Sequence, residues 1–163
     1  MKEINIANWN HNAFTLFDKD WGLVTAGTSD AFNTMTISWG SLGILWNKKI
    51  VTIYIRPTRY TYKFMESNDY FTLSFYTENY KDTLFMLGTK SGKEYPKVKE
   101  SKLHPIPCQE SITFKEAKCT LLCKKIYHYD ISPLQFQDPT LDKNYPKLDY
   151  HRAYIGEIIA IYE

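Results

Sequence analysis

The stretch that decides the fold is residues 50–55, Ile-Val-Thr-Ile-Tyr-Ile, followed at once by residues 56–61, Arg-Pro-Thr-Arg-Tyr-Thr. The first six residues are all β-branched or aromatic, which predicts a buried strand. Arg56-Pro57 ends that strand, and the apolar spacing then becomes helical as far as Ser67, with Thr58 as the expected N-cap. The sequence therefore predicts a buried strand that leads directly into the start of a helix.

Several other short elements are expected around this junction. Strands are predicted over Leu23 to Thr28, Thr34 to Trp39, Tyr70 to Tyr76, Ile112 to Phe114, Lys118 to Tyr127 and His151 to Tyr162. We expect Gly40 and Gly43 to end the strand over Thr34 to Trp39. A helix is expected over Asn79 to Leu87, ended by Gly88. An exposed loop or short helix is expected over Thr89 to Lys102, and a long loop over Ser132 to Tyr150. Many short strands with two short helices predict a mainly β fold, a β-barrel with peripheral helices.

Length and composition limit the class of protein. The chain has 163 residues, the size of one domain over 1–163, with 44% apolar and 23% charged residues, which excludes disordered, collagen-like and coiled-coil chains. A net charge of +2 predicts no nucleic-acid or acidic-membrane partner, and neither a secretory peptide nor a membrane span is expected. The three cysteines form no CxxC motif, which favours small buried side chains in a reducing cytoplasm over a disulfide framework or zinc site.

The strand–helix junction carries the residues of an anion site. Arg56 and Arg59 supply guanidinium groups, Thr58 and Thr61 supply hydroxyls, and the first helical turn supplies free N–H groups. A single phosphate would suit such a compact cluster. On residue types alone, two exposed arginines beside an ordinary helix start explain the pattern equally well.

Three other places could carry chemistry. Residues 33–40 alternate hydroxyls with apolar groups and end in Trp39 and a glycine, which suits the edge of a heteroaromatic ring but also a strand with a solvated face. Residues 88–94 lack the spacing of a Walker A motif, which leaves a flexible turn with hydroxyl and ammonium donors. The four histidines are scattered, and His151, beside Asp149 and Arg152, is the one weak candidate for a catalytic residue.

Four segments in this order resemble the flavin reductase-like family, and within it the flavoredoxin-like branch. They are residues 33–40, 54–61, 88–92 and 149–158. The resemblance runs from Leu23 to the end of the chain. It implies a split β-barrel, Greek-key-like and FMN-binding, that forms a homodimer with the flavin near the subunit interface.

The resemblance also implies which residues contact the cofactor. Met35 to Trp39 would lie along the isoalloxazine, and the junction residues would serve the phosphate and ribityl end, with Lys90 and Ser91 closing over it. The full implied set is Asn33, Thr34, Met35, Thr36, Ile37, Ser38, Trp39, Arg56, Thr58, Arg59, Tyr60, Thr61, Lys90 and Ser91. Lys93 departs from the family, where an arginine is common, and gives a point charge without a bidentate fork.

The implied activity is an NAD(P)H-dependent flavin oxidoreductase. NADH or NADPH would reduce the flavin, and electrons would leave to a free flavin or a redox partner protein. No protein acid or base is required for that step. A different class stays open, an FMN-binding electron carrier or sensor without nicotinamide turnover, and so does a chain that binds no cofactor.

Overall fold

The structure, a computed structural model, describes residues 1–163. Its strands are β1 (Glu3–Ile4), β2 (Gly22–Gly27), β3 (Phe32–Ile37), β4 (Gly40–Leu45), β5 (Lys48–Ile55), β6 (Tyr70–Phe75), β7 (Pro105–Cys108), β8 (Ser111–Phe114), β9 (Cys119–Asp130) and β10 (Arg152–Tyr162). The helices are α1 (Tyr60–Ser67), α2 (Lys81–Thr89) and α3 (Lys97–Glu100), with short 3₁₀ turns and one π-helix, η2 (Thr15–Asp20). The prediction of a mainly β fold with a few short helices is confirmed.

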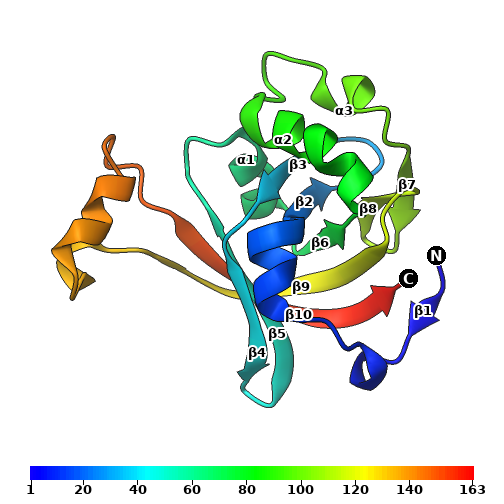
Figure 1. The fold of residues 1–163 in the computed structure, drawn as a ribbon, viewed down its shortest axis with the longest axis horizontal. Coiled ribbons are helices and arrows are strands. Elements are labelled where there is room, and N and C mark those ends of the chain that lie inside the picture. The colour runs from blue at the N-terminus through cyan, green and yellow to red at the C-terminus, as the bar shows by residue number, and fades with distance from the viewer.

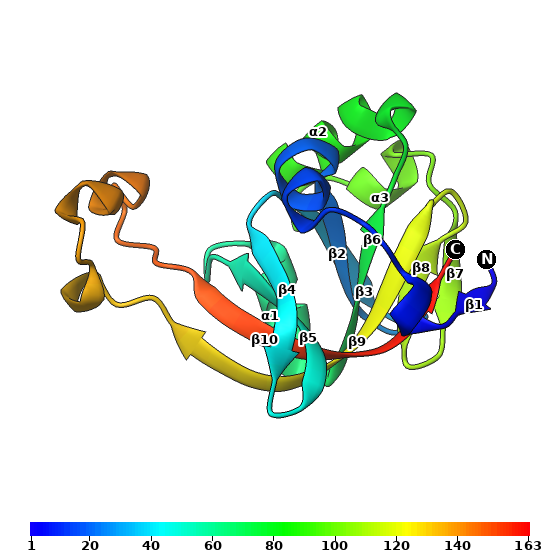
Figure 2. The same cartoon turned by 60° about the horizontal axis from the view of Figure 1, so that its bottom comes forward.

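One antiparallel sheet forms the body of the molecule, with strand order β3-β2-β6-β9-β10-β5-β4 and β1 added beside β10. The sheet curls around the core, while α1 and α2 contact β3 (Figures 1 and 2). The two end strands of this order, β3 and β4, are consecutive in the chain but are not hydrogen-bonded to each other. The barrel is therefore split at this point, and Ser38 and Trp39 connect its two edges.

The core explains why the strands form where they do. Inward-facing side chains such as Ile53, Phe71, Leu73 and Tyr154 are buried in one large apolar cluster. Removing such area from water drives the packing of the sheet. All three cysteines are free and buried, as predicted, and Cys119 and Cys123 lie in this cluster.

Some expected boundaries are wrong for identifiable physical reasons. Gly40 and Gly43 both lie in strand β4 instead of breaking the strand. At Gly40 the reason for a glycine is packing, because a Cβ there would collide with the ring of Phe17. Gly88 lies inside α2, where its bare backbone faces Thr36. Strand β7 escaped prediction because it contains two prolines, which suit an edge strand.

The N-cap prediction is also wrong. Helix α1 begins at Tyr60 with Arg59 at the cap position, and no side chain caps it. Thr58 instead directs its hydroxyl to Asp149, at 3.3 Å. The first N–H groups of α1 therefore have no side-chain acceptor within the protein.

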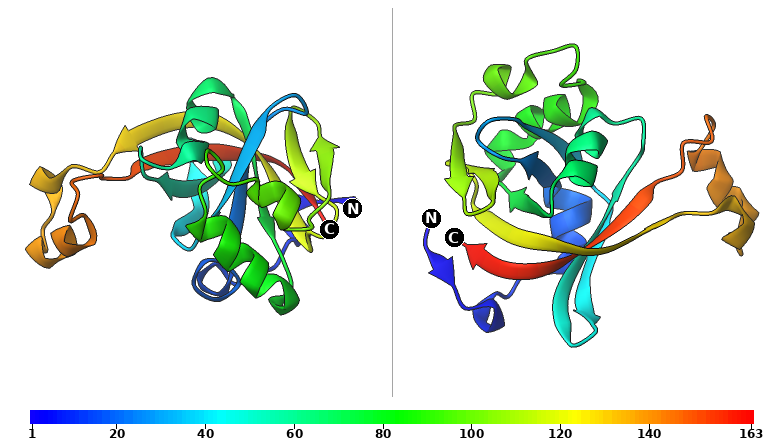
Figure 3. Two further views of the ribbon diagram at one scale, coloured as in Figure 1. Left: turned by 90° about the horizontal axis from the view of Figure 1, so that it is seen from above. Right: turned by 180° about the vertical axis from the view of Figure 1, so that it is seen from behind.

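Strands β9 and β10 extend beyond the barrel and carry the segment 131–151 away from it as an arm (Figures 1 and 3). The predicted loop is confirmed there, with two 3₁₀ turns, Pro133–Gln135 and Pro139–Asn144. None of the helices is both long and apolar enough to cross a membrane.

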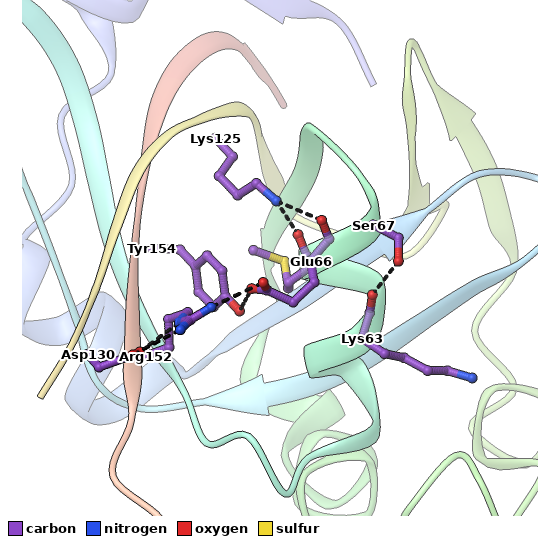
Figure 4. A network of polar contacts seen from close by, with 8 residues as sticks. Lys63, Glu66, Ser67, Lys125, Asp130, Arg152 and Tyr154 are labelled. Carbon is purple, nitrogen blue, oxygen red and sulfur yellow. Dashed lines mark hydrogen bonds and ion pairs between the residues drawn. The ribbon is translucent and has the colours of Figure 1, made fainter.

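A polar network fixes α1 to the base of the arm (Figure 4). Arg152 donates to both carboxylate oxygens of Asp130, at 2.6 and 2.9 Å, and to Glu66 at 3.1 Å. The hydroxyl of Tyr154 donates to Glu66 at 2.5 Å, and Lys125 donates to the carbonyls of Met65 and Glu66. The C-terminal turn of α1 is thereby held against β9 and β10.

Candidate functional site

Two cavities share Arg59, the first beside the split in the barrel and the second at the start of α1. The first has a volume of about 210 Å³ and is lined by Met35, Thr36, Ile37, Ser38, Trp39, Tyr54, Arg56, Arg59, Gly88 and His151. The second has about 180 Å³ and is lined by Thr58, Arg59, Tyr60, Thr61, Thr89, Lys90, Ser91 and Lys97. Arg59 lines both, so the two cavities form one elongated site with a strand edge at one end and a cationic pocket at the other.

Most of the residues predicted from the sequence meet here. Met35 to Trp39 and Arg56 line the first cavity, and Thr58, Tyr60, Thr61, Lys90 and Ser91 line the second. The hydroxyl of Thr36 is already used, because it donates to the carbonyl of Leu84 at 2.6 Å. The free backbone groups of the β3 edge remain as the polar contacts at this end of the site.

Asn33 and Thr34 line neither of the two cavities. Thr34 is fully buried, and its hydroxyl donates to the carbonyl of Val24 at 2.8 Å and accepts from Thr25. Asn33 donates to the hydroxyl of Thr61 at 2.7 Å, and a Cβ on Gly92 would collide with its amide oxygen. Asn33 therefore fixes β3, α1 and the 90–92 turn relative to one another, and Thr34 belongs to the interior of the sheet.

Arg59 is a partly buried cation without a carboxylate partner. Its guanidinium donates to the carbonyl of Gly88, and no acidic side chain lies within ion-pairing distance. Burial lowers its pKa from the ordinary value, and the nearby charge of Arg56 lowers the pKa further. Both effects disfavour the charged form, so an anion in this pocket would relieve them.

Lys97 is the residue of this site that the sequence analysis missed. It belongs to the segment predicted as an exposed loop or short helix, and it lies in the short helix α3, yet it is only 3% exposed and its Nζ donates to the carbonyl of Leu87 at 3.0 Å. Burial, and then the charge of Arg59, lower its pKa to about 8. Val98, the next residue, packs against an apolar cluster and holds α3 on the body, a contact that the sequence pattern did not reveal.

Arg56 differs from Arg59, because its charge is already paired. It donates to Asp149 at 2.7 Å and to the carbonyl of Asn144 at 2.8 Å, and it lies 5.1 Å from the centre of the Tyr145 ring. Burial opposes ionisation of Asp149, but the charge and hydrogen bond of Arg56 outweigh it and lower the pKa of that carboxyl. Arg56 and Thr58 thus hold the arm, and each also lines one of the two cavities, so their contact with a phosphate stays a prediction.

His151 lies at the mouth of the first cavity. Its Nδ1 is 2.9 Å from the hydroxyl of Tyr145, and its ring centre is 5.1 Å from that of Trp39. Burial, and then the charge of Arg56, lower its pKa to about 4, so the ring is neutral near pH 7. Its Nε2 has no partner within the protein and remains available at a cavity that His151 lines.

The comparisons with known proteins agree with this geometry. A family model described as "Flavin reductase like domain" matches residues 16–163, and comparison with curated protein sequences gives no match. Among solved structures, the FMN-binding domain of a flavin reductases-like enzyme from Shewanella baltica OS155 has a TM-score of 0.71 at 17% identity, over 98% of this chain and 75% of that one.

Two flavoredoxins have the same fold. The protein from Methanosarcina acetivorans has a TM-score of 0.69 at 19% identity, over 100% of this chain and 76% of that one. The protein from Desulfovibrio vulgaris (Miyazaki F) has a TM-score of 0.68 at 18% identity, over 98% and 76%. These likenesses show a split β-barrel, and the chain belongs to the flavin reductase-like domain family.

Proposed function

We propose that this chain binds FMN and transfers electrons through it, as a flavin reductase or flavoredoxin-type oxidoreductase with NADH or NADPH as the donor. The observation that carries the proposal is the pair of Arg59 and Lys97, two buried or partly buried cations that face one small cavity without a carboxylate. Leaving such charges unpaired is unfavourable, so the pocket is built for an anion. That pocket continues into a cavity along the β3 edge.

The donor set fits the chemistry of FMN. A terminal phosphate accepts hydrogen bonds from guanidinium, ammonium and hydroxyl groups, which Arg59, Lys97, Lys90 and Ser91 supply. The free N–H groups at the start of α1 add to them. The cavity between β3, Trp39 and Tyr54 offers apolar walls and an unpaired strand edge, which suit a flat ring that carries carbonyl and amide groups.

The residues of the chain would bind and orient the group, while FMN when bound supplies the hydride and single-electron chemistry. Arg59 and Lys97 would hold its anionic end, and Trp39 would shield the other end from water. The neutral ring of His151 places an uncharged nitrogen at the cavity, where a donor would stabilise negative charge that develops on reduction.

A homodimer is part of this proposal. The arm projects from the barrel and exposes apolar surface, with Leu148 at 71% exposure. Trp46, at the tip of the β4–β5 hairpin, is also exposed. A second copy could cover these groups by packing against the arm and the β4–β5 hairpin. Sedimentation of the purified protein should give twice the mass of the chain.

The test is an absorption spectrum of the protein after FMN is added and the mixture is dialysed. We expect flavin bands that stay with the protein and that bleach without air when NADH or NADPH is added. Bands that remain but bleach only with a reduced partner protein would indicate an electron carrier. A colourless protein after dialysis would contradict the proposal as a whole.

A further inference from the structure

A third and larger cavity adjoins the first. Its volume is about 680 Å³, and its lining includes Ser38, Trp39 and Tyr54, which also line the first cavity. Its other walls come from the π-helix η2 and the residues before it, from β4, and from the arm. Trp39 therefore stands between this cavity and the site proposed for the flavin ring.

The walls of this cavity are aromatic and almost without charge. Phe14 and Phe17 come from the η2 segment, and Phe136, Leu141 and Tyr145 come from the arm. No lysine, arginine or histidine lines it, and the one ionisable acid, Asp18, has a side chain 72% exposed to solvent. Such a lining favours an apolar occupant.

The absence of cations from the lining favours a neutral redox partner over a nicotinamide dinucleotide. A nicotinamide dinucleotide carries a pyrophosphate, which needs cationic side chains or a helix N-terminus. No cationic side chain lines this cavity. The 13–20 helix begins on its wall, but the N–H groups of Phe14 and Thr15 are already bound by the side chain of Asn12, and the nearby charge of Arg56 is occupied by Asp149. A neutral molecule meets no such requirement.

Two features indicate that defined structural elements form the walls of this cavity. Phe17 and Asp18 on its wall belong to a π-helix, a rare form that is frequent at functional sites. Its far wall, the arm, is held in place by the Arg56–Asp149 ion pair and by the contact of Tyr145 with His151. The volume lies within the range of small-molecule sites, roughly 300–1,000 Å³.

We propose that this cavity binds an uncharged, flat, conjugated molecule, aromatic or quinone-like, that serves as a second redox partner beside the flavin. The proposal rests on the proposed function for the redox role, but binding in the cavity depends only on its own walls.

The experiment is calorimetric titration of the protein, with and without FMN, using 2-naphthol as a neutral probe and naphthalene-2-sulfonate as its anionic counterpart. We expect the neutral probe to bind at one site per chain and the sulfonate to bind about tenfold more weakly, because no cation compensates its charge. Quenching of tryptophan fluorescence should accompany binding, since Trp39 lines the cavity.

Two leucines of the arm give matched variants. Leu141 lines the cavity and Leu134 does not, and both are exposed on the surface, so neither replacement threatens the fold. Leu141→Gln should weaken 2-naphthol binding about fivefold, whereas Leu134→Gln should leave it unchanged. Reduction of duroquinone by the FMN-loaded protein should fall only in the first variant.

Three outcomes would overturn the proposal. Equal affinity for both probes would show that the walls do not select against charge, and equal effects of the two leucine variants would place binding elsewhere. Failure of the protein to bind 2-naphthol, with the dimer formed and FMN still bound, would mean that a second copy covers this surface. Loss of FMN binding with 2-naphthol binding intact would instead contradict the proposed function and leave the cavity assignment standing.

Discussion

Two regions near the split in the barrel differ in whether their buried positive charges have a carboxylate partner. At the base of the arm, Arg56 is paired with Asp149 at 2.7 Å and covers the Tyr145 ring. At the start of α1, Arg59 and Lys97 repel each other and face a cavity without a carboxylate. Paired charge holds the arm to the body, whereas the unpaired buried charge lies where we propose that an anion binds.

The largest effect should follow from removing one of the unpaired cations. Lys97→Met should weaken FMN binding about 10- to 100-fold, the value of a hydrogen bond to a charged group. The FMN-free protein should become more stable, because a buried charge without a counter-charge is lost. Lys99→Met, an exposed position on the same helix, is the matched control and should change neither quantity. A less stable FMN-free Lys97→Met protein would contradict the account.

Removing the paired cation should lower the stability of the FMN-free protein, whereas removing Lys97 should raise it. Arg56→Met leaves Asp149 without its partner and frees the arm, so the FMN-free protein should melt a few degrees lower. Limited proteolysis should cut the segment 132–150 faster than in the unchanged protein. FMN affinity should fall less than in Lys97→Met. A larger loss of FMN affinity than in Lys97→Met would indicate that Arg56 itself binds the phosphate.

The pH dependence of stability and of FMN affinity tests whether the charge of Lys97 is unpaired. The pKa of Lys97 is lowered from 10.5 to about 8, so between these values the unfolded chain binds the proton and the folded chain does not. Stability of the FMN-free protein should therefore rise as the pH increases through this window, and FMN affinity should fall because the ammonium is lost. Melting temperatures and FMN titrations measured against Lys97→Met isolate the effect. Parallel curves for the two proteins would contradict it.

A smaller effect concerns His151, whose pKa is lowered from 6.5 to about 4. Between these values the unfolded chain binds the proton and the folded chain does not, so stability should fall as the pH drops from about 6.5 toward about 4. His151→Gln keeps a polar side chain and should remove this part of the acid sensitivity. Thermal melts across that range check the prediction, and an unchanged pH dependence would show that the ring is already charged in the folded state.

The contrast between the regions also explains what the sequence could predict. Residues 50–61 specified a strand followed by a helix because β-branched residues and helical spacing are local signals, and both elements are present. The roles of Arg56 and Arg59 could not be separated in this way, since the partner of Arg56 lies 93 residues away. Distant pairing leaves no local pattern.

The remaining errors have the same origin. Gly40 is required by the ring of Phe17, and the burial of Lys97 depends on the docking of α3, neither of which a local pattern reveals. Thr34 has the same side-chain direction as Thr36 along the strand, yet its hydroxyl is buried and donates to the carbonyl of Val24, a partner that no local pattern names. A prediction of residue types at a site was thus more accurate than a prediction of their individual partners.

The central claim is that Arg59 and Lys97 form a pocket for the phosphate of FMN. The most direct test compares the affinities for FMN and for riboflavin, which lacks the phosphate, in the unchanged protein and in Arg59→Ala. We predict that the unchanged protein binds FMN much more tightly and that this preference shrinks about 10- to 100-fold in the variant, while riboflavin affinity stays the same. An undiminished preference for FMN in Arg59→Ala would contradict the claim.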